Sequence, residues 1–236
     1  MMNTIPRLRS AAIFSLLWVA GLNLQAQITT DNSPTPEELV ALLVGPDVQV
    51  SNIAFTGTDV QRGSFVNNNG NLTIGEGIVL STGNIALMAS PNTTGSAGEI
   101  VGGGGYPDLT TLGGQNTNDA AVLEFDFIAT GDSLSFNFCF GSEEYNEWVD
   151  SDFNDVFGLF LDGPGITGTF QNNGINLATV PDTDGTPISI NSINNNLNSD
   201  YYIDNESNAD PNATEMDGFT VTMTASSVLQ CGETYH

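Results

Sequence analysis

Residues 122–140 read VLEFDFIATGDSLSFNFCF, and this stretch decides the fold class. Apolar residues alternate with polar or small ones in both of its halves, so each half presents one apolar face when extended. The segment between the halves, residues 129–132, has the composition of a turn. The pattern therefore predicts two half-buried antiparallel strands. The residues of the two apolar faces are Leu123, Phe125, Phe127, Leu134, Phe136, Phe138 and Phe140.

Further short strands are expected around this stretch. Residues 156–161 are almost continuously apolar and predict a central strand, and residues 219–224 alternate again. Residues 35–38, TPEE, form a capping box with proline at the first helical position, so one short helix is expected there. Residues 90–118 are expected to be a long loop. The sequence thus predicts an all-β fold, a two-sheet antiparallel sandwich (jelly-roll-like) with one short N-terminal helix. Beyond the two faces above, its expected core contains Val156, Phe157, Leu159 and Phe160.

The N-terminus has the pattern of a secretory signal. Arg7 and Arg9 precede an apolar run over 11–20, and small residues end at Ala26. The run is shorter than the ~20 residues that span a bilayer, so a membrane anchor is disfavoured. We expect a signal peptide over 1–26, a linker over 27–34 and one domain over 35–236. Its last residues resemble the beginning of another strand, so the domain is expected to be truncated at its C-terminal end.

The charge balance restricts the partners of the exported chain. The sequence has 3 Lys+Arg against 28 Asp+Glu, and two of the three basic residues lie in the signal. Arg62 is the remaining one. Nucleic acids and anionic membranes need basic residues to replace their counterions, so neither is an expected partner. Such a surface attracts cations instead.

The densest group of oxygen ligands lies in residues 141–155, between two apolar segments. Ca²⁺ takes six to eight oxygens and tolerates irregular geometry. The DSDFN sequence of 150–154 begins like an EF-hand loop, but the glycine and the final glutamate of that loop are missing. A separate kind of Ca²⁺ loop is therefore predicted, with a solvated acidic loop as the alternative; 182–185 and 204–212 are further acidic loops. The expected metal ligands are Glu143, Glu144, Asp150, Asp152, Asn154 and Asp155.

Two further pairs of residues carry predictions. Tyr145 and Trp148 lie in the same acidic stretch, and aromatic residues in a loop usually pack or bind, so both are candidate partner contacts. Cys139 and Cys231 are the two cysteines, and an exported chain can join them in a disulfide. The sequence alone leaves both pairing and free thiols open.

Catalysis has little support in the sequence. His236 is the single histidine, and neither a G-x-S-x-G elbow nor an H-E-x-x-H motif occurs. Paired carboxylates could serve an extracellular glycoside hydrolase, but any acidic chain offers such pairs. We therefore expect a protein that is not an enzyme.

Several blocks of sequence carry a family resemblance. FGSEEY at 140–145 and SDFNDVFG at 151–158 resemble the choice-of-anchor L domain, which has some likeness to the nidogen extracellular domain. The resemblance covers nearly all of the chain after the signal. It implies a bacterial domain near the N-terminus of a large exported protein, of the kind common in bacteria with type IX secretion.

The sequence therefore predicts a non-catalytic module at the outer cell surface or outside the cell. It is expected to be structural or adhesive and stabilised by Ca²⁺ in its acidic end loop. Its expected partner is a surface glycan or another extracellular protein. A lectin-like carbohydrate-binding module is the alternative, followed by the glycoside hydrolase.

Overall fold

The computed structural model describes residues 28–68, 72–89, 91–206 and 214–236. Most regular elements are β-strands, and every strand pairing in this part of the chain is antiparallel. The all-β class is therefore confirmed. The expected signal peptide lies outside the described residues. Within them, no helix has the length and apolar character needed to cross a membrane.

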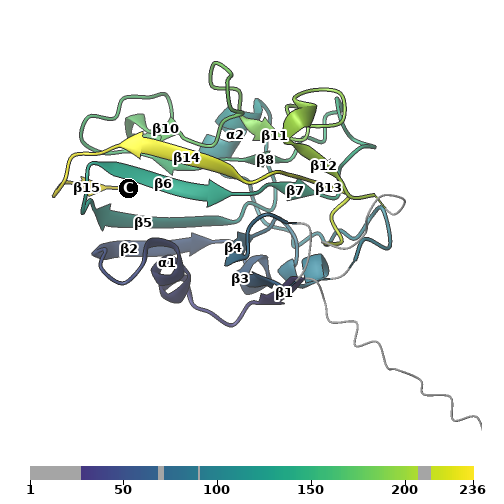
Figure 1. The fold of residues 1–236 in the computed structure, drawn as a ribbon, viewed down its shortest axis with the longest axis horizontal. Helices are drawn as coiled ribbons and strands as arrows, with labels where there is room; N and C mark the ends of the chain where they lie inside the picture. The colour runs from purple at the N-terminus through teal and green to yellow at the C-terminus, as the bar shows by residue number, and fades with distance from the viewer. Residues whose placement is uncertain (1–27, 69–71, 90, 207–213) are drawn as a thin grey trace, which may run out of the picture.

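Two sheets contain the N-terminal half of the fold (Figure 1). In one, β5 (Val122–Ile128) lies between β2 (Val50–Thr56) and β15 (Thr234–Tyr235). In the other, β3 (Arg62–Asn67) lies between β1 (Ile28–Asp31) and β4 (Glu76–Leu80). Strand β1 occupies the stretch that was expected to be a linker. Ile28 is fully buried, so this stretch belongs to the folded domain.

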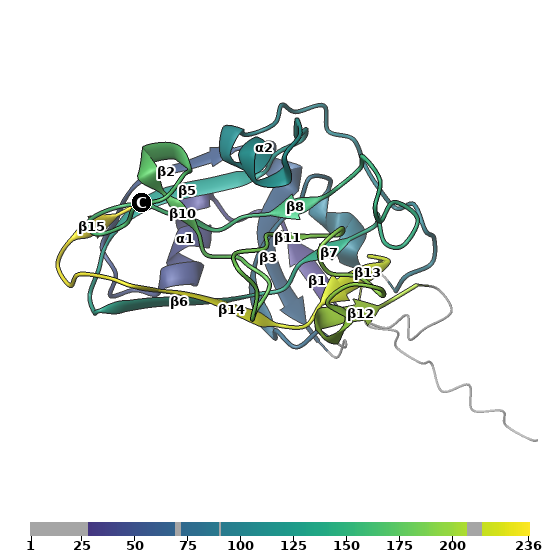
Figure 2. The same cartoon turned by 90° about the horizontal axis from the view of Figure 1, so that it is seen from above.

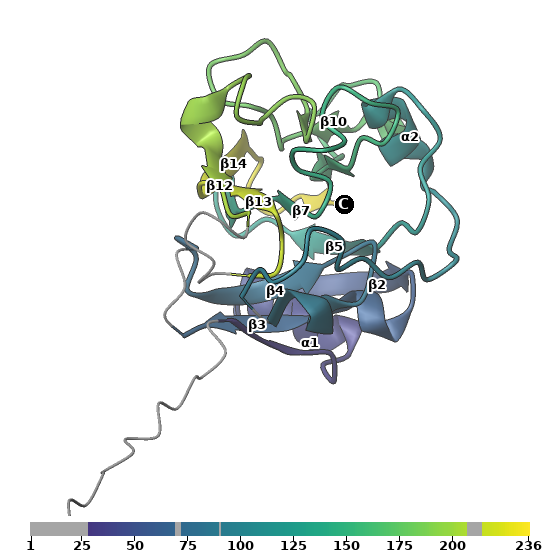
Figure 3. The ribbon, with the colours of Figure 1, turned by 90° about the vertical axis from the view of Figure 1, so that its right-hand side faces the viewer.

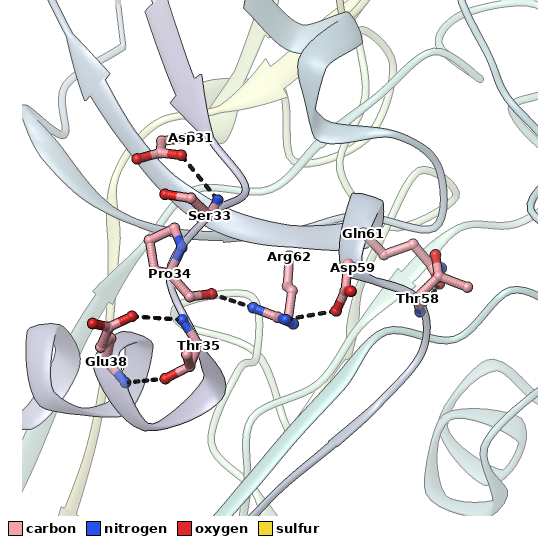
Figure 4. Close-up of polar contacts among 9 residues, drawn as sticks. All are labelled: Asp31, Ser33, Pro34, Thr35, Glu38, Thr58, Asp59, Gln61 and Arg62. Carbon is pink, nitrogen blue, oxygen red and sulfur yellow. Dashed lines mark hydrogen bonds and ion pairs between the residues drawn. The ribbon is translucent and has the colours of Figure 1, made fainter.

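The N-terminal helix begins where its capping box predicts. α1 (Pro36–Val44) contacts β2 and β4 and buries Leu39 and Val40. Glu38 N donates to Thr35 Oγ1 at 3.3 Å, and Thr35 N donates to Glu38 Oε2 at 2.8 Å (Figure 4). Both N-terminal donors are thereby satisfied, which fixes the start of the helix.

Arg62 is held beside this helix. Its guanidinium donates to the Pro34 carbonyl and forms an ion pair with Asp59 at 2.6 Å (Figure 4). The arginine side chain is largely buried, while that of Asp59 is exposed. The one basic residue of the chain after the expected signal is thus committed to a local structural contact.

The strongly patterned strands do not form a hairpin. β6 (Ser133–Phe138) pairs with β14 (Met223–Val228), while β5 pairs with β2 and β15. The predicted turn connects β5 to β6, but the two strands belong to different sheets and lie apart in Figure 2. Each strand therefore finds its partners far away in the sequence.

The register of β6 and β14 also explains why the two cysteines do not meet. Phe138 pairs with Met223 at one end of the ladder, and Ser133 pairs with Val228 at the other. Cys139 follows the first end and Cys231 follows the second. Because five residue steps at about 3.4 Å each separate the ends, a disulfide cannot span them. Both thiols are free, so the disulfide considered from the sequence is not formed.

Three small sheets complete the strand pairings. The expected continuous strand over 156–161 is divided into two, and between the halves Leu159 N donates to the side chain of Asn176, at Oδ1, at 3.0 Å. Each half has its own partner. The pairs are β8 (Val156–Phe157) with β11 (Ile188–Ser189), and β9 (Phe160–Leu161) with β10 (Ile175–Asn176). The third sheet places β13 (Gly218–Thr220) between β12 (Tyr202–Asp204) and β7 (Gly141–Ser142).

A second helix lies in the stretch that was expected to be only a loop. α2 (Pro107–Gly113) begins with a proline in its first turn and ends at Gly114, whose φ of +72° is the left-handed conformation that glycine adopts easily. The proline and the terminal glycine were present in the sequence, but the many glycines around them favoured the prediction of a loop. The remainder of 90–118 is irregular.

The core consists of two clusters, and many of its residues are not among those predicted from the sequence. Of the predicted core residues, only Phe127 and Phe138 are buried, and the others are half-buried. Segment 171–217, rich in Asn and Asp, supplies several of the most buried side chains. The larger cluster contains Phe138, Ala178, Val180, Ile188, Ile193, Met223 and Ala225. The smaller contains Phe127, Ala129, Leu161, Leu229 and Tyr235.

The arrangement in space agrees with the predicted sandwich. Figure 3 shows α1, β2, β3 and β4 on one side, and β10, β12, β13 and β14 on the other. The sheets are short and divided, so irregular segments cover much of the core.

Candidate functional site

The candidate site starts at one end of the β12–β13–β7 sheet, far from β15 (Figure 1). Asp204 pairs with Gly218, and Gly218 pairs with Ser142. Because the strands are antiparallel, the next residues at this end lie side by side. Asn205 N accordingly donates to Asp217 O at 2.9 Å. The three residues that the register brings together are Glu143, Asn205 and Asp217.

Asn92 reaches this sheet end from a distant loop. Its Nδ2 donates to Asp217 Oδ1 and to the Asn205 carbonyl, both at 2.8 Å. Asn205 Nδ2 in turn donates to the carbonyls of Thr214 at 2.8 Å and Met216 at 2.7 Å. The amide nitrogens of both asparagines are therefore satisfied, and their Oδ1 atoms have no hydrogen-bond partner.

The loop that carries Asn92 also binds two glutamates. Glu143 Oε2 accepts from Ala97 N at 2.9 Å. Glu215 Oε1 accepts from Thr94 N at 3.1 Å and from the Thr93 hydroxyl at 3.0 Å. Backbone N–H groups thus hold carboxylates on both sides of Gly95.

Gly95 leaves a space between two further carboxylates. The position that a Cβ would take on Gly95 lies 3.4 Å from Glu147 Oε1 and 3.7 Å from Asp217 Oδ2. Asp217 is only 2% exposed, and its Oδ2 has no hydrogen-bond partner. We call the group Asn92, Glu143, Glu147, Asn205 and Asp217 around this space the Gly95 corner.

The carboxylates of the Gly95 corner repel one another. Burial raises the pKa of Glu143 to about 7, with the charges of Asp217, Glu215 and Glu147 adding to it against the Ala97 hydrogen bond. Burial likewise raises the pKa of Asp217 to about 6. No basic side chain among the described residues forms an ion pair with either of them. A bound cation would relieve this repulsion.

Unpartnered buried oxygens concentrate at this end of the molecule. Eight buried side-chain N or O atoms among the described residues have no hydrogen-bond partner, and seven of them are oxygens here. Buried polar atoms in proteins are normally paired, so such a group is unusual. Five of the seven are carbonyl or carboxylate oxygens, which can only accept. They belong to Asn92, Glu143, Asn146, Asn205 and Asp217.

The six metal ligands predicted from the sequence do not lie together in the structure. Only Glu143 lies in the Gly95 corner. Glu144 lies near Asp155, whose carboxylate accepts from Ser142 Oγ at 2.7 Å, and burial raises the pKa of both carboxyls. Among the described residues, no three His, Cys, Asp or Glu side chains are grouped closely enough to hold a metal ion.

The other three predicted ligands lie along the loop that follows. Asp150 N donates to Asn191 Oδ1 at 2.6 Å, and Asn191 N donates to Asn154 Oδ1 at 3.2 Å. Asp152 is exposed, and its carbonyl accepts from Gln115 Nε2 at 2.8 Å. This loop is therefore tied to neighbouring segments by its own hydrogen bonds.

Local sequence patterns do not indicate most of the Gly95 corner. Asn92, Glu147 and Asp217 were not among the predicted ligands. Asn205 belongs to the acidic stretch 204–212, of which residues 207–212 lie outside the described part. Asn92 and Asp217 are 125 positions apart in the chain, so no local pattern links them.

The two predicted partner contacts have different environments. Tyr145 is fully buried and packs against Tyr202, with ring centroids 4.8 Å apart, so its prediction as a partner contact is wrong. The Tyr145 ring therefore anchors residues 141–155 to β12. Trp148 is 45% exposed and lies edge-to-face on Phe153, which is 61% exposed, at 4.8 Å between ring centroids.

Comparison with known proteins gives one match. The family model of the choice-of-anchor L domain matches residues 27–236. No curated protein and no solved structure matches the chain. Domains of this family are surface-associated extracellular modules and are generally non-catalytic. Because the match covers essentially the whole chain, this protein belongs to the choice-of-anchor L domain family.

Proposed function

We propose that this module is structural or adhesive, that it binds a surface glycan or another extracellular protein, and that Ca²⁺ stabilises its acidic end. The exposed pair Trp148–Phe153 carries the adhesive part of the proposal. Two large aromatic side chains lie together on the surface, on a loop with fixed hydrogen bonds. Exposed aromatic groups of this kind supply much of the binding energy at recognition surfaces.

The acidic surroundings favour a neutral or cationic partner. Asp150 and Asp152 are exposed beside the aromatic pair, and the nearby Glu147 is exposed too. An anionic glycan or nucleic acid would be repelled by these charges. A neutral glycan can stack an apolar sugar face on Trp148 while its hydroxyls donate to the carboxylates.

The hydrolase alternative draws on a single observation. The raised pKa of Glu143 is the property expected of a general acid. Its neighbour Asp217, however, is only 2% exposed, so a sugar ring cannot reach both carboxylates. The geometry therefore favours a binding role. Turnover of a glycan that disappears in Glu143→Gln would support the hydrolase instead.

A glycan array probed with the secreted chain in Ca²⁺ tests the adhesive role. Trp148→Ala and Phe153→Ala are each expected to weaken binding at least tenfold while leaving the melting temperature within a few degrees. The matched control is Val228→Ala, since Val228 is 80% exposed on β14, away from the acidic end. Unchanged binding by Trp148→Ala would remove Trp148 as a contact.

Thermal unfolding with Ca²⁺ and with chelator tests the structural role. A ligand that binds only the native state stabilises it by about 2.7 kcal/mol at 100 times its Kd. A structural module without a ligand is expected to show this shift and an empty glycan array. A chain with neither glycan binding nor a Ca²⁺-dependent shift would contradict the proposal.

A further inference from the structure

We infer that a divalent cation, Ca²⁺ by its ligand chemistry, binds in the space beside Gly95, between the carboxylates of Glu147 and Asp217, with Glu143 turning toward it on binding. The inference deepens the Ca²⁺ part of the proposed function and rests on it. It moves the site away from the continuous loop 150–155 to three chain segments. Asn92 Nδ2 ties Asp217 Oδ1 to the Asn205 carbonyl, and the unpartnered Oδ1 atoms of Asn92 and Asn205 are candidate neutral ligands.

The space itself is the first observation. A carbon atom placed at the Cβ position of Gly95 would be 3.4 Å from Glu147 Oε1 and 3.7 Å from Asp217 Oδ2. An atom-sized volume therefore lies between two carboxylate oxygens from different segments. Gly95 and Glu147 are exposed, so the space lies at the surface, with the buried Asp217 Oδ2 behind it.

The unpartnered oxygens are the second, independent observation. Asp217 is 2% exposed and Asn92 4% exposed, and each has one side-chain oxygen without a hydrogen-bond partner. Glu143 adds an unpartnered Oε1. Buried acceptors are normally paired, so several unpaired ones together need a common explanation. Ca²⁺ binds carboxylate and amide oxygens of this kind and takes six to eight of them.

The charge of the chain points in the same direction. Arg62 is held by Asp59 and the Pro34 carbonyl, and His236 lies against Asp126 at 2.7 Å on the β5–β15 edge. Neither can neutralise the Gly95 corner. Buried carboxylates without a basic partner are stabilised by a metal ion or by protonation.

Binding of an ion requires side chains to turn, because no three carboxylates are grouped in advance among the described residues. Asp217 is held by Asn92 Nδ2, which donates to its Oδ1 at 2.8 Å, and its Oδ2 lies 3.7 Å from the Cβ position of Gly95. Glu147 is exposed and Glu143 half-buried, so their side chains can turn toward the ion. The ion would then join the 92–97 loop, the segment after β7 and the segment before β13.

Two isosteric or minimal substitutions test the site. Gly95→Ala puts a methyl group in the space where the ion would lie, at ordinary contact distance from both carboxylates, and removes no ligand. Asp217→Asn removes one charge with little change in shape. The matched control is Gly98→Ala, in the same loop, where an added Cβ meets nothing within 4 Å.

The measurement is Ca²⁺ titration by calorimetry, with melting temperatures in Ca²⁺ and in chelator. We expect Gly95→Ala and Asp217→Asn each to weaken Ca²⁺ binding at least tenfold and to remove most of the Ca²⁺-dependent rise in melting temperature. Gly98→Ala and the double variant Asp150→Asn/Asp152→Asn are expected to behave like the natural chain. In chelator, Asp217→Asn is expected to melt at the same or a higher temperature, because one repelling charge is gone.

The outcomes separate this inference from the proposal on which it rests. Full Ca²⁺ binding by both Gly95→Ala and Asp217→Asn, with loss in the 150/152 double variant, would overturn the site but leave a Ca²⁺-stabilised module standing. Absence of Ca²⁺ binding in the natural chain would overturn the site together with the Ca²⁺ part of the proposed function. The glycan-binding test of Trp148 is independent of both results.

Discussion

Two acidic regions lie next to each other in this molecule, and they differ in how their oxygens are used. Loop 150–155 is dense in Asp and Asn, yet Asn191, Ser142 and Gln115 bind its backbone and side chains. The residues of the Gly95 corner come from segments far apart in the sequence, but Asn92, Glu143, Asn205 and Asp217 each keep one buried side-chain oxygen without a donor. Many ligand atoms in a row therefore do not make a cation site when the protein already satisfies them. A few buried oxygens without partners are a stronger indication.

The largest expected effect is at Tyr145, which lies in the chain between Glu143 of the Gly95 corner and loop 150–155. Tyr145 is fully buried between Tyr202 and Phe140, with ring centroids 4.8 and 6.5 Å away. Tyr145→Ala is expected to destabilise the fold by about 3–5 kcal/mol, the usual cost of truncating a buried aromatic side chain. Denaturant unfolding measures the loss, which should appear both in Ca²⁺ and in chelator.

The control for this variant is Tyr145→Phe. The Tyr145 hydroxyl is buried without a hydrogen-bond partner, so its removal is expected to be neutral or slightly stabilising. A loss as large as that of Tyr145→Ala would show that the hydroxyl, and not the ring, holds the loop. The hydroxyl would then have a partner in solution.

The second effect concerns loop 150–155, whose oxygens already have hydrogen-bond donors. Ser142 is 2% exposed, donates to Asp155 Oδ2 at 2.7 Å and accepts from Glu144 N at 3.0 Å. Ser142→Ala leaves a buried carboxylate without this donor and is expected to cost about 1–3 kcal/mol at pH 7. The exposed Ser135→Ala serves as the control, because Ser135 lies on the open face of β6.

The pH dependence of Ser142→Ala follows from Asp155. Burial raises the pKa of Asp155 above its ordinary value of 3.8, and the Ser142 hydroxyl opposes this rise. A raised folded-state pKa means that the contribution of Asp155 is most favourable below pH 3.8 and is lost as pH rises. The hydroxyl matters most to the charged form, so the cost of Ser142→Ala should shrink between pH 7 and pH 4. A cost independent of pH would contradict this role.

The smallest effect concerns the backbone of loop 150–155. Asp150 has φ +63°, a left-handed conformation that Asp tolerates better than most residues. Asp150→Ala is expected to lose about 1 kcal/mol or less, and Asp150→Gly to be neutral. Asp152→Ala is the control and should lie within about 0.5 kcal/mol of the natural chain. Calorimetry should show unchanged Ca²⁺ affinity in all three; a loss in any of them would bring this loop back as the cation site.

The sequence predicted local features of the fold well. Alternation in β6 and the capping box at Thr35 depend on neighbours within a few residues, and both appear as expected. Ile188 and Ile193 are buried in a segment whose Asn and Asp content is, by itself, typical of a loop. Their burial depends on packing against β6 and β14, which local patterns do not show.

The site was predictable only in part for the same reason. Glu143 follows a strand end in a recognisable acidic stretch, so it was found. Asp217 and Asn92 became neighbours of Glu143 only through the β7–β13 register and the path of the 92–97 loop. A prediction that β7 pairs with β13 would have indicated Asp217 as a neighbour of Glu143. No sequence pattern indicates Asn92.

Arg62 also determines how the folded chain meets proteases of the trypsin type, which cut after lysine or arginine. From residue 28 to residue 236 the sequence offers one such bond, between Arg62 and Gly63. This bond lies in β3, the middle strand of its sheet, paired on one side with β1 and on the other with β4. Cleavage requires a chain segment to leave its sheet, so digestion must wait for opening of both pairings. The native domain is consequently a poor substrate for such enzymes outside the cell.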